Sequence, residues 1–458
     1  MFNTAYFRSR PFPLKQGYAA SSLMILTILL LLFSPPYSRA EEASGKLTEK
    51  AAIEIALRQH PAVKESKERA EASRYQIGVS ESAYYPQVTS GANYYYGNAF
   101  IKGPGGGTAP SITPVGVATA FPSNASDFFI YRFNVNQLIY DFGKTPGNVA
   151  GAKATYNQSR EDYAGTRDTV VLNVRTAYFG FLAAQRAFTV SQESVRQNQE
   201  LLKQAQGFYQ VGIRAKIDVT KAEANLYTAE ADLIKAKNGV ELTRVTLMTA
   251  LGLKTWSFSG LEESLEATPK LMSQAELKQK ALNQRPEILK NRYQQDASEA
   301  SLKVARAGFF PTLSSTASYG WQGEAYPLKD NWWVGMGVTF PLFEGFTTIS
   351  SVRSAKAQIR ATQANAEVLR QDISKEVDQS YLDLKSAWDV IRATTKALEA
   401  ARENFRLAQG RYKVGVGSII EVTDAQVQLF QADLRNVQAL YDYRTAEARL
   451  DKAIGVAY

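Results

Sequence analysis

The hydrophobic positions of this chain follow a helical period over two unusually long stretches. In each, apolar or small residues recur at alternating spacings of four and three. The first stretch, 146–210, starts at Pro146 and contains no further proline, which predicts one continuous helix of about 64 residues and roughly 95 Å. The second is 347–412. The seams include Val170, Val174, Ala177, Phe181 and Tyr209 in the first stretch, and Ile373, Val377, Ser380, Leu384 and Tyr412 in the second.

Small and large residues alternate along both seams, which suits knobs-into-holes packing between neighbouring helices. A plain dimeric coiled coil would explain the seams, but it would leave the remaining elements without a role. Those elements are helical patterns of about half the length at 62–83, 216–250, 286–307 and 419–454, and short amphipathic pieces at 48–59 and 273–284.

Four short segments alternate strictly between apolar and polar or small residues, which predicts strands. Aromatic side chains dominate the apolar face, as a wall between lipid and water requires. The alternative is a pair of half-buried hairpins in a soluble domain. The apolar faces contain Val88, Ala92, Tyr94 and Tyr96; Phe129, Tyr131, Phe133, Val135 and Ile139; Leu313, Ala317, Tyr319 and Trp321; and Trp332, Val334, Met336, Val338 and Phe340.

Four strands cannot close a barrel, and an open sheet edge in lipid leaves backbone groups unpaired. If the strands lie in a membrane, several copies of the chain must therefore share one barrel.

The order of these patterns repeats within the chain. His60-Pro61 is echoed by Arg285-Pro286, and the Tyr-Gln-Val-Gly turn at 209–212 by Tyr-Lys-Val-Gly at 412–415. A Gly/Pro/Ala-rich loop at 97–126 is present only in the first half. Two internal repeats are the expected organisation. The expected segments are a signal peptide at 1–40; a first repeat at 41–260 with β-hairpin 86–142, long helix 146–210 and helix 216–250; and a second repeat at 261–458 with β-hairpin 311–343, long helix 347–412 and helix 419–454.

The N-terminus has the three zones of a secretory signal. Four basic residues and no acid lie within the first 40 residues, an apolar run extends from Leu23 to Phe33, and small residues at Ser38 and Ala40 make Glu41 the expected first mature residue. Excluding this segment reduces the net charge from +9 to +5, and no Lys/Arg run indicates nucleic-acid binding.

Composition leaves little room for catalysis. Cysteine is absent and His60 is the single histidine, which excludes thiol nucleophiles, Cys-ligated zinc and multi-histidine metal sites. His60 precedes Pro61 at an expected helix end, where a histidine more often caps than binds a ligand. We expect no enzyme activity, cofactor or metal.

Together these features resemble the TolC family of outer-membrane efflux and secretion channels. The resemblance rests on the repeat, on Tyr85-Pro86 and Phe310-Pro311 before the strands, on Leu-Ile-Tyr-Asp-Phe-Gly ending at Gly143, and on the two Tyr-x-Val-Gly turns. It implies a mixed α and β membrane fold in which a homotrimer builds a twelve-stranded β-barrel, four strands per subunit, continued by a long α-helical barrel through the periplasm. It also implies three further partners: outer membrane lipid, a periplasmic adaptor protein and an inner-membrane ABC or proton-driven transporter.

The resemblance also suggests a periplasmic gate. Glu421 and Asp424 match two acids that can line the tunnel mouth, and their i, i+3 spacing places both on one helix face. Three copies would form a ring of six acids, which favours cation binding. The alternative is a solvated acidic face stabilised by the helix dipole.

Two further positions concern a latch of the closed gate. Tyr412 and Asp218 match a tyrosine and its usual hydrogen-bond partner, although Tyr412 also ends a seam and could serve packing alone. Gly417 stands where family members can carry a latch arginine, whereas Arg214 is present at the equivalent position of the first repeat.

We therefore expect an outer membrane exit duct of a tripartite efflux or type I secretion system, a passive gated channel with most of the chain in the periplasm. The alternative is a periplasmic coiled-coil adaptor without a barrel. A secreted hydrolase would need a catalytic constellation that the sequence does not show.

Overall fold

The computed structural model describes residues 45–97, 126–263 and 273–456. The expected signal peptide and nearly all of the loop at 97–126 lie outside these ranges. The chain divides into two units, residues 1–46 with 257–260, and residues 47–256 with 261–458. The second unit contains every helix and all four long strands described below.

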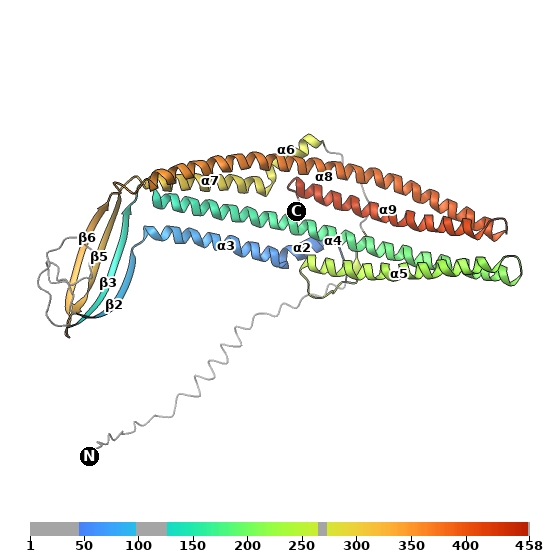
Figure 1. Cartoon of the computed structure of the whole chain (residues 1–458), viewed down its shortest axis with the longest axis horizontal. Helices are drawn as coiled ribbons and strands as arrows, with labels where there is room; N and C mark the ends of the chain where they lie inside the picture. Colours follow the sequence, from blue (N-terminus) through green and yellow to red (C-terminus); the bar gives the residue numbers. More distant parts are fainter. Residues whose placement is uncertain (1–44, 98–125, 264–272, 457–458) are drawn as a thin grey trace, which may run out of the picture. The chain divides into compact units, whose positions relative to one another are not determined.

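The helices and strands are drawn in Figure 1, where the colours follow the sequence. Their bounds are β1 Lys46–Leu47, α2 Glu49–Gln59, α3 Pro61–Glu81, a 3₁₀ turn Ser82–Tyr84, β2 Gln87–Gly97, β3 Ser126–Tyr140, α4 Lys144–Gln210, α5 Lys216–Leu251, β4 Gly260–Leu261, α6 Gln274–Gln284, α7 Pro286–Ala307, β5 Thr312–Gly323, β6 Lys329–Thr339, α8 Thr347–Lys413 and α9 Ile419–Ala453.

The two long helices, α4 and α8, have 67 residues each, which corresponds to about 100 Å. Helix α4 packs against α5, α8 packs against α9, and α4 also contacts α9. Seam residues form these interfaces: Val174 and Val377 are both 0 % exposed. One expected seam residue is misplaced, because Tyr209 is 47 % exposed and its neighbour Phe208 packs inward instead.

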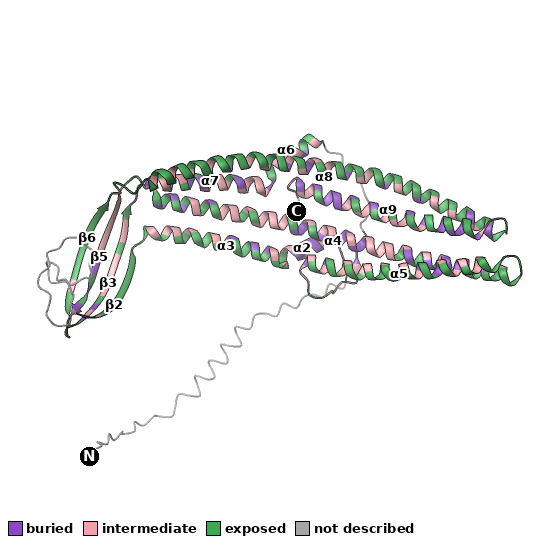
Figure 2. Cartoon of the chain, in the orientation of Figure 1, coloured by how far each residue is buried: buried purple, intermediate pink, exposed green. Residues whose placement is uncertain are grey.

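The four long strands form one antiparallel sheet in the order β2-β3-β5-β6. Its register aligns Val88, Val135, Ala317 and Val334 in one row, so the predicted apolar residues of all four strands share one face. This face is largely exposed, and Figure 2 shows β2 and β6 mainly in the colour of exposed residues. The prediction is interrupted at Ile139, where a register shift between Leu138 and Tyr140 leaves that residue out of the ladder.

Each passage from strand to long helix contains two consecutive residues with left-handed backbone. These are Phe142 and Gly143 before α4, with φ of 53° and 98°, and Gly345 and Phe346 before α8, with φ of 61° and 66°. A left-handed phenylalanine is strained, so the surrounding contacts must hold it. The Phe142 ring stacks on Phe310 with centroids 5.2 Å apart.

Buried polar contacts join the short helices to the long ones. The Arg175 guanidinium in α4 binds Glu49 Oε1 of α2 and Asp451 Oδ2 of α9, each at 2.7 Å. Arg285, only 6 % exposed in its side chain, binds Glu287 in a bidentate manner at 3.1 Å and also binds Glu376 of α8. Three elements thus meet at each arginine.

Within the part of the chain that the structure describes, no helix combines the length and hydropathy needed to cross a membrane.

Candidate functional site

The candidate gate residues gather where each long helix turns into its shorter partner. Gly212, between α4 and α5, and Gly415, between α8 and α9, have φ of 74° and 84°, a conformation that favours glycine. The amide of the residue after each glycine donates back into the long helix, from Ile213 to Phe208 O at 2.9 Å and from Val416 to Arg411 O at 3.1 Å. Both turns are therefore tight and similar.

Arg214 connects the first turn to the second. Its Nη2 donates to Gly415 O at 3.0 Å and also to Gly417 O. Its guanidinium carbon lies 5.5 Å from the centroid of the Tyr412 ring, within the range of a cation–π contact. One side chain of the α4–α5 hairpin thus clamps the α8–α9 hairpin.

Gly417 leaves room for this clamp. A Cβ built on it would lie 3.0 Å from both Arg411 Cβ and Tyr412 N, closer than side chains normally approach. An arginine at this position, as the resemblance suggests for a latch, would require neighbouring atoms to move by a few tenths of an ångström. Arg214 binds the backbone carbonyl of Gly417.

Tyr412 is fully buried, at 0 % exposure, among apolar residues of both hairpins. The Phe208 ring meets it edge-on at 5.6 Å. Its hydroxyl has no hydrogen-bond partner in the described residues, so the expected hydrogen bond to Asp218 is not formed. Burial and the nearby negative charge of Asp218 raise the pKa of Tyr412, and Arg214 opposes this. Packing is the role the structure supports for this ring.

Glu421 and Asp424 lie in the first turns of α9, and both are exposed. The Ser418 hydroxyl caps the helix by accepting from Glu421 N at 3.2 Å. The Glu421 carboxylate lies 3.4 Å from Arg411 Nε, an exposed pair of small energetic weight. Asp218 lies in the equivalent first turn of α5 and is half-buried. The structure therefore brings Arg214 and Tyr412 into contact, but it leaves both acids facing solvent.

A small polar cavity separates the two hairpins farther along the helices. Its volume is about 80 Å³, and Asn198 of α4, Asn225 of α5 and Gln426 of α9 are among its walls. Gln426 is 4 % exposed, and its Nε2 has no hydrogen-bond partner in the described residues. Part of the contact between the hairpins is thus polar.

The sequence patterns did not single out the apolar side chains around both turns. These residues are well exposed despite being aliphatic: Val211, Ile213 and Ile217 in the first turn region, and Val414, Val416 and Ile420 in the second, at 52–73 % exposure. Turns normally carry polar residues. A valine or isoleucine on each side of the turn glycine is the sequence signal that could have identified these exposed residues.

No group of three or more His, Cys, Asp or Glu side chains in residues 45–97, 126–263 and 273–456 could hold a metal ion. His60 acts as the expected cap, because its Nδ1 accepts from Ala62 N at 3.2 Å at the start of α3.

Comparisons with known proteins agree on one family. The family described as outer membrane efflux protein matches residues 52–253 and 277–456. Outer membrane protein TolC of Escherichia coli is 23 % identical over 447 residues, covering 94 % of this chain and 86 % of its own. The probable efflux pump outer membrane protein TtgC of Pseudomonas putida is 25 % identical over 321 residues, covering 69 % of this chain and 66 % of its own.

The fold has solved counterparts. The crystal structure of the Campylobacter jejuni CmeC outer membrane channel superposes with a TM-score of 0.75 at 19 % identity, covering 90 % of this chain and 86 % of that one. These relatives and neighbours are channel proteins rather than enzymes. The chain belongs to the outer membrane efflux protein family and is a protein of the outer membrane.

Proposed function

We propose that three copies of this chain form a passive exit duct through which substrates leave the cell. The four-stranded sheets join into a twelve-stranded barrel in the outer membrane, and the helices continue as a tunnel through the periplasm. Each chain supplies two similar repeats, 41–260 and 261–458. The observation that carries the proposal concerns the described residues at the two sides of the subunit. There the edge strands of the sheet lack a pairing strand, and the outer helices expose apolar side chains.

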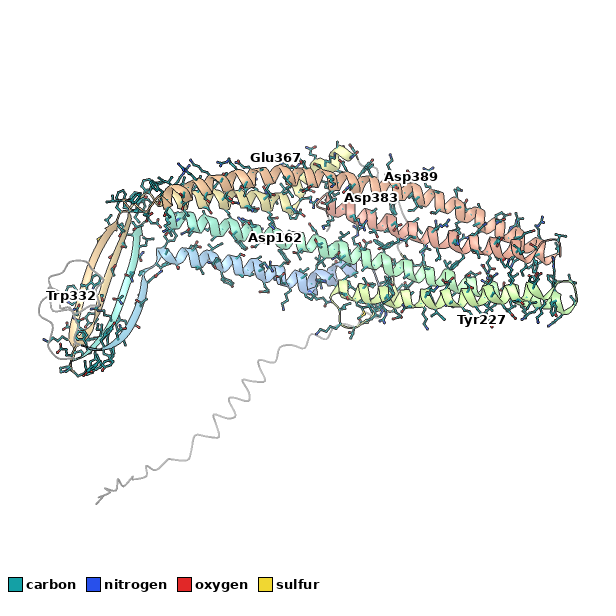
Figure 3. All side chains as sticks on the ribbon, in the orientation of Figure 1. Asp162, Tyr227, Trp332, Glu367, Asp383 and Asp389 are labelled. Atoms are coloured by element: carbon teal, nitrogen blue, oxygen red, sulfur yellow. The ribbon has the colours of Figure 1, made fainter. Side chains whose placement is uncertain are left out.

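Strands β2 and β6 form the two edges of the sheet, and each pairs on one side only among the described residues. Their apolar faces are exposed, with Tyr96 at 69 %, Trp332 at 69 % and Met336 at 70 %; Trp332 is labelled on β6 in Figure 3. The exposed aromatic face does not suit water, and the open edge does not suit lipid, where unpaired backbone groups find no hydrogen-bond partner. Pairing of β2 with β6 of the next copy removes both edges.

The outermost helices show the same imbalance. Helix α5 has a stripe of exposed apolar residues on the side away from those it buries, and Tyr227 within it is labelled in Figure 3. Helix α8 has a similar stripe opposite its buried seam. Two different stripes on two different helices suit a head-to-tail contact that closes into a ring. The stripes are Ile217, Tyr227, Ile234, Leu242 and Val245 on α5, and Val368, Leu382, Val390 and Leu407 on α8.

The turn ends of the helices are the proposed gate and docking site. Arg214 and Tyr412 hold the two hairpins together, and Glu421 and Asp424 supply the acids of a tunnel mouth. The exposed aliphatic residues around both turns, such as Val416 at 71 %, suit the apolar side chains of a periplasmic adaptor. An inner-membrane transporter provides the energy, either an ABC or a proton-driven one. TtgC is described as a probable efflux pump protein, which favours efflux over type I secretion for this chain.

Fractionation and substitution test this proposal. The unmodified chain should sediment with outer membranes and migrate as a heat-resistant trimer. Ile234→Glu, which places a charge in the α5 stripe, should abolish the trimer. Val416→Glu is the matched control: it places the same charge on an equally exposed residue of the turn, and it should retain the trimer while losing adaptor binding. A monomeric periplasmic protein that still binds a transporter would instead support the coiled-coil adaptor.

A further inference from the structure

The charged side chains of the sheet are sorted by face. The four strands of the sheet, β2, β3, β5 and β6, contain two acids, Asp127 and Asp330, and two cations, Arg132 and Lys329, among their described residues. The register pairs Asp127 with Tyr96 and Asp330 with Trp321, which places both acids on the aromatic face. Arg132 pairs with Gly320, and Lys329 pairs with Gln322. Both cations therefore lie on the opposite face.

That opposite face is mostly polar or open. Its cross-strand contacts include Ser318 Oγ donating to Asn134 Oδ1 at 2.9 Å. Its other polar or small members include Thr89, Gly91 and Asn93 on β2, Asn136 on β3, Thr316 on β5, and Asn331, Gly335 and Gly337 on β6. Its apolar or aromatic exceptions are Tyr95, Phe128, Ile130, Leu138 and Trp333.

The structure holds Arg132 in a defined position. Its Nη2 donates to Gln322 Oε1 at 3.0 Å, and Gln322 is only 7 % exposed. Its ladder neighbours on both sides are glycines, Gly91 on β2 and Gly320 on β5. A Cβ at Gly320 would overlap Tyr131 O and lie 3.0 Å from Arg132 Cγ, so a side chain at this position would displace both the strand and Arg132.

Both cations lie toward the strand ends far from the long helices. Lys329 is the first residue of β6, whose other end leads to α8. Arg132 lies two rows below it in the register, with Gln322 in the row of Lys329 and Gly320 in the row of Arg132. Residues two rows apart point to the same face, so the two cations are near neighbours on that face, toward one end of the sheet.

We propose that Arg132 and Lys329 make the outer mouth of the duct selective for anionic solutes such as carboxylates, sulfonates and phosphates. The inference rests on the proposed trimeric barrel, in which this face lines the water-filled interior and three copies form a belt of six cations. No acid of the described strands faces them. A belt of one sign in a narrow, low-dielectric wall raises the local concentration of counter-ions. Gln322 is a positioning residue that aims Arg132.

Reversal potentials in planar bilayers test the assignment, with potassium chloride as the probe. At about 0.1 M salt, Arg132→Gln with Lys329→Gln should lower the chloride-to-potassium permeability ratio by roughly 2- to 5-fold. The difference should shrink at 1 M, where charges are screened within about 3 Å. Arg132→Lys should retain most of the selectivity, and Gln322→Ala should lose part of it.

Asp127→Asn and Asp330→Asn are the matched controls, because they change charge at the same end of the sheet but on the aromatic face. They should leave the ratio unchanged. Channels that conduct with an unaltered ratio in the double variant overturn this inference alone, whereas an unmodified chain that forms no channel overturns the proposed function. If the double variant does not assemble, the exposed Lys329→Gln change gives the same readout with a smaller shift.

Discussion

Arg214→Ala removes a side chain of the first turn that hydrogen-bonds to the second, and its effect can be worked from the contacts. The change deletes two hydrogen bonds to the carbonyls of Gly415 and Gly417 and a cation–π contact with Tyr412. Arg214 is partly exposed, so each charged hydrogen bond is worth about 1 kcal/mol, and the ring contact adds about 0.5–1 kcal/mol. If the two turns form the proposed gate and the structure is its closed state, that state should therefore lose roughly 2–3 kcal/mol, a ~30- to 150-fold shift towards the open one.

Single-channel recording in planar bilayers measures this shift as the ratio of open to closed time. Arg214→Lys should give an intermediate value, because an ammonium can donate to more than one carbonyl but lacks the planar guanidinium that lies over the Tyr412 ring. Lys216→Ala is the matched control, since it removes a cation from the same turn region without touching the clamp. The reasoning is refuted if Arg214→Ala channels keep the unmodified ratio, or if Lys216→Ala produces the same shift.

Three further changes have defined outcomes. Tyr412→Phe removes a buried hydroxyl without a partner and should stabilise the fold by about 1 kcal/mol in thermal unfolding, while a clear loss would reveal a missed hydrogen bond. The pKa of Tyr412 is raised from 10.0 in the folded state, so the stability linked to its protonated form is fully present below pH 10 and is lost as the pH rises above it. The Phe variant has no such titration and should therefore resist alkaline unfolding better. Replacing Glu421 and Asp424 with Ala should weaken block of the pore by divalent cations, and unchanged block would remove both from the gate. Arg285→Met should destabilise the chain by about 2–4 kcal/mol in detergent melts. Burial raises the pKa of Glu287, but Arg285 outweighs burial and the pKa is lowered from 4.5. The parent therefore loses stability as the pH falls below 4.5, and the variant, which lacks Arg285, should lose less.

Local periodicity was sufficient for the parts of the fold that it directly controls. Helix α4 spans Lys144–Gln210 where the seam predicts 146–210, and the apolar residues of the four strands share a face as their alternation requires. Side-chain direction follows from the spacing of residues in a helix or strand, so the pattern carries this information in full.

Tertiary contacts determine the features that the sequence patterns missed. The choice of Phe208 over Tyr209 at the first turn depends on the partner ring of Tyr412 in the other hairpin. The left-handed Phe142 depends on Phe310, more than a hundred residues away. The expected latch shows the same limit. Tyr412 and Asp218 match the expected pair in residue type, yet the Tyr412 hydroxyl has no hydrogen-bond partner among the described residues. Arg214 instead binds backbone carbonyls, which every residue has and which no sequence motif identifies.

The polar cavity between α4, α5 and α9 has a thermal consequence. A space of about 80 Å³ with asparagine and glutamine walls has room for two or three water molecules, at about 30 Å³ each. Sliding one hairpin against the other at this level would exchange wetted amides, but it would also move Ala229, Val427 and Phe430, which line the same space. Heat capacity changes with apolar area, so the enthalpy of such a movement should depend on temperature to the extent that it covers or uncovers these three side chains.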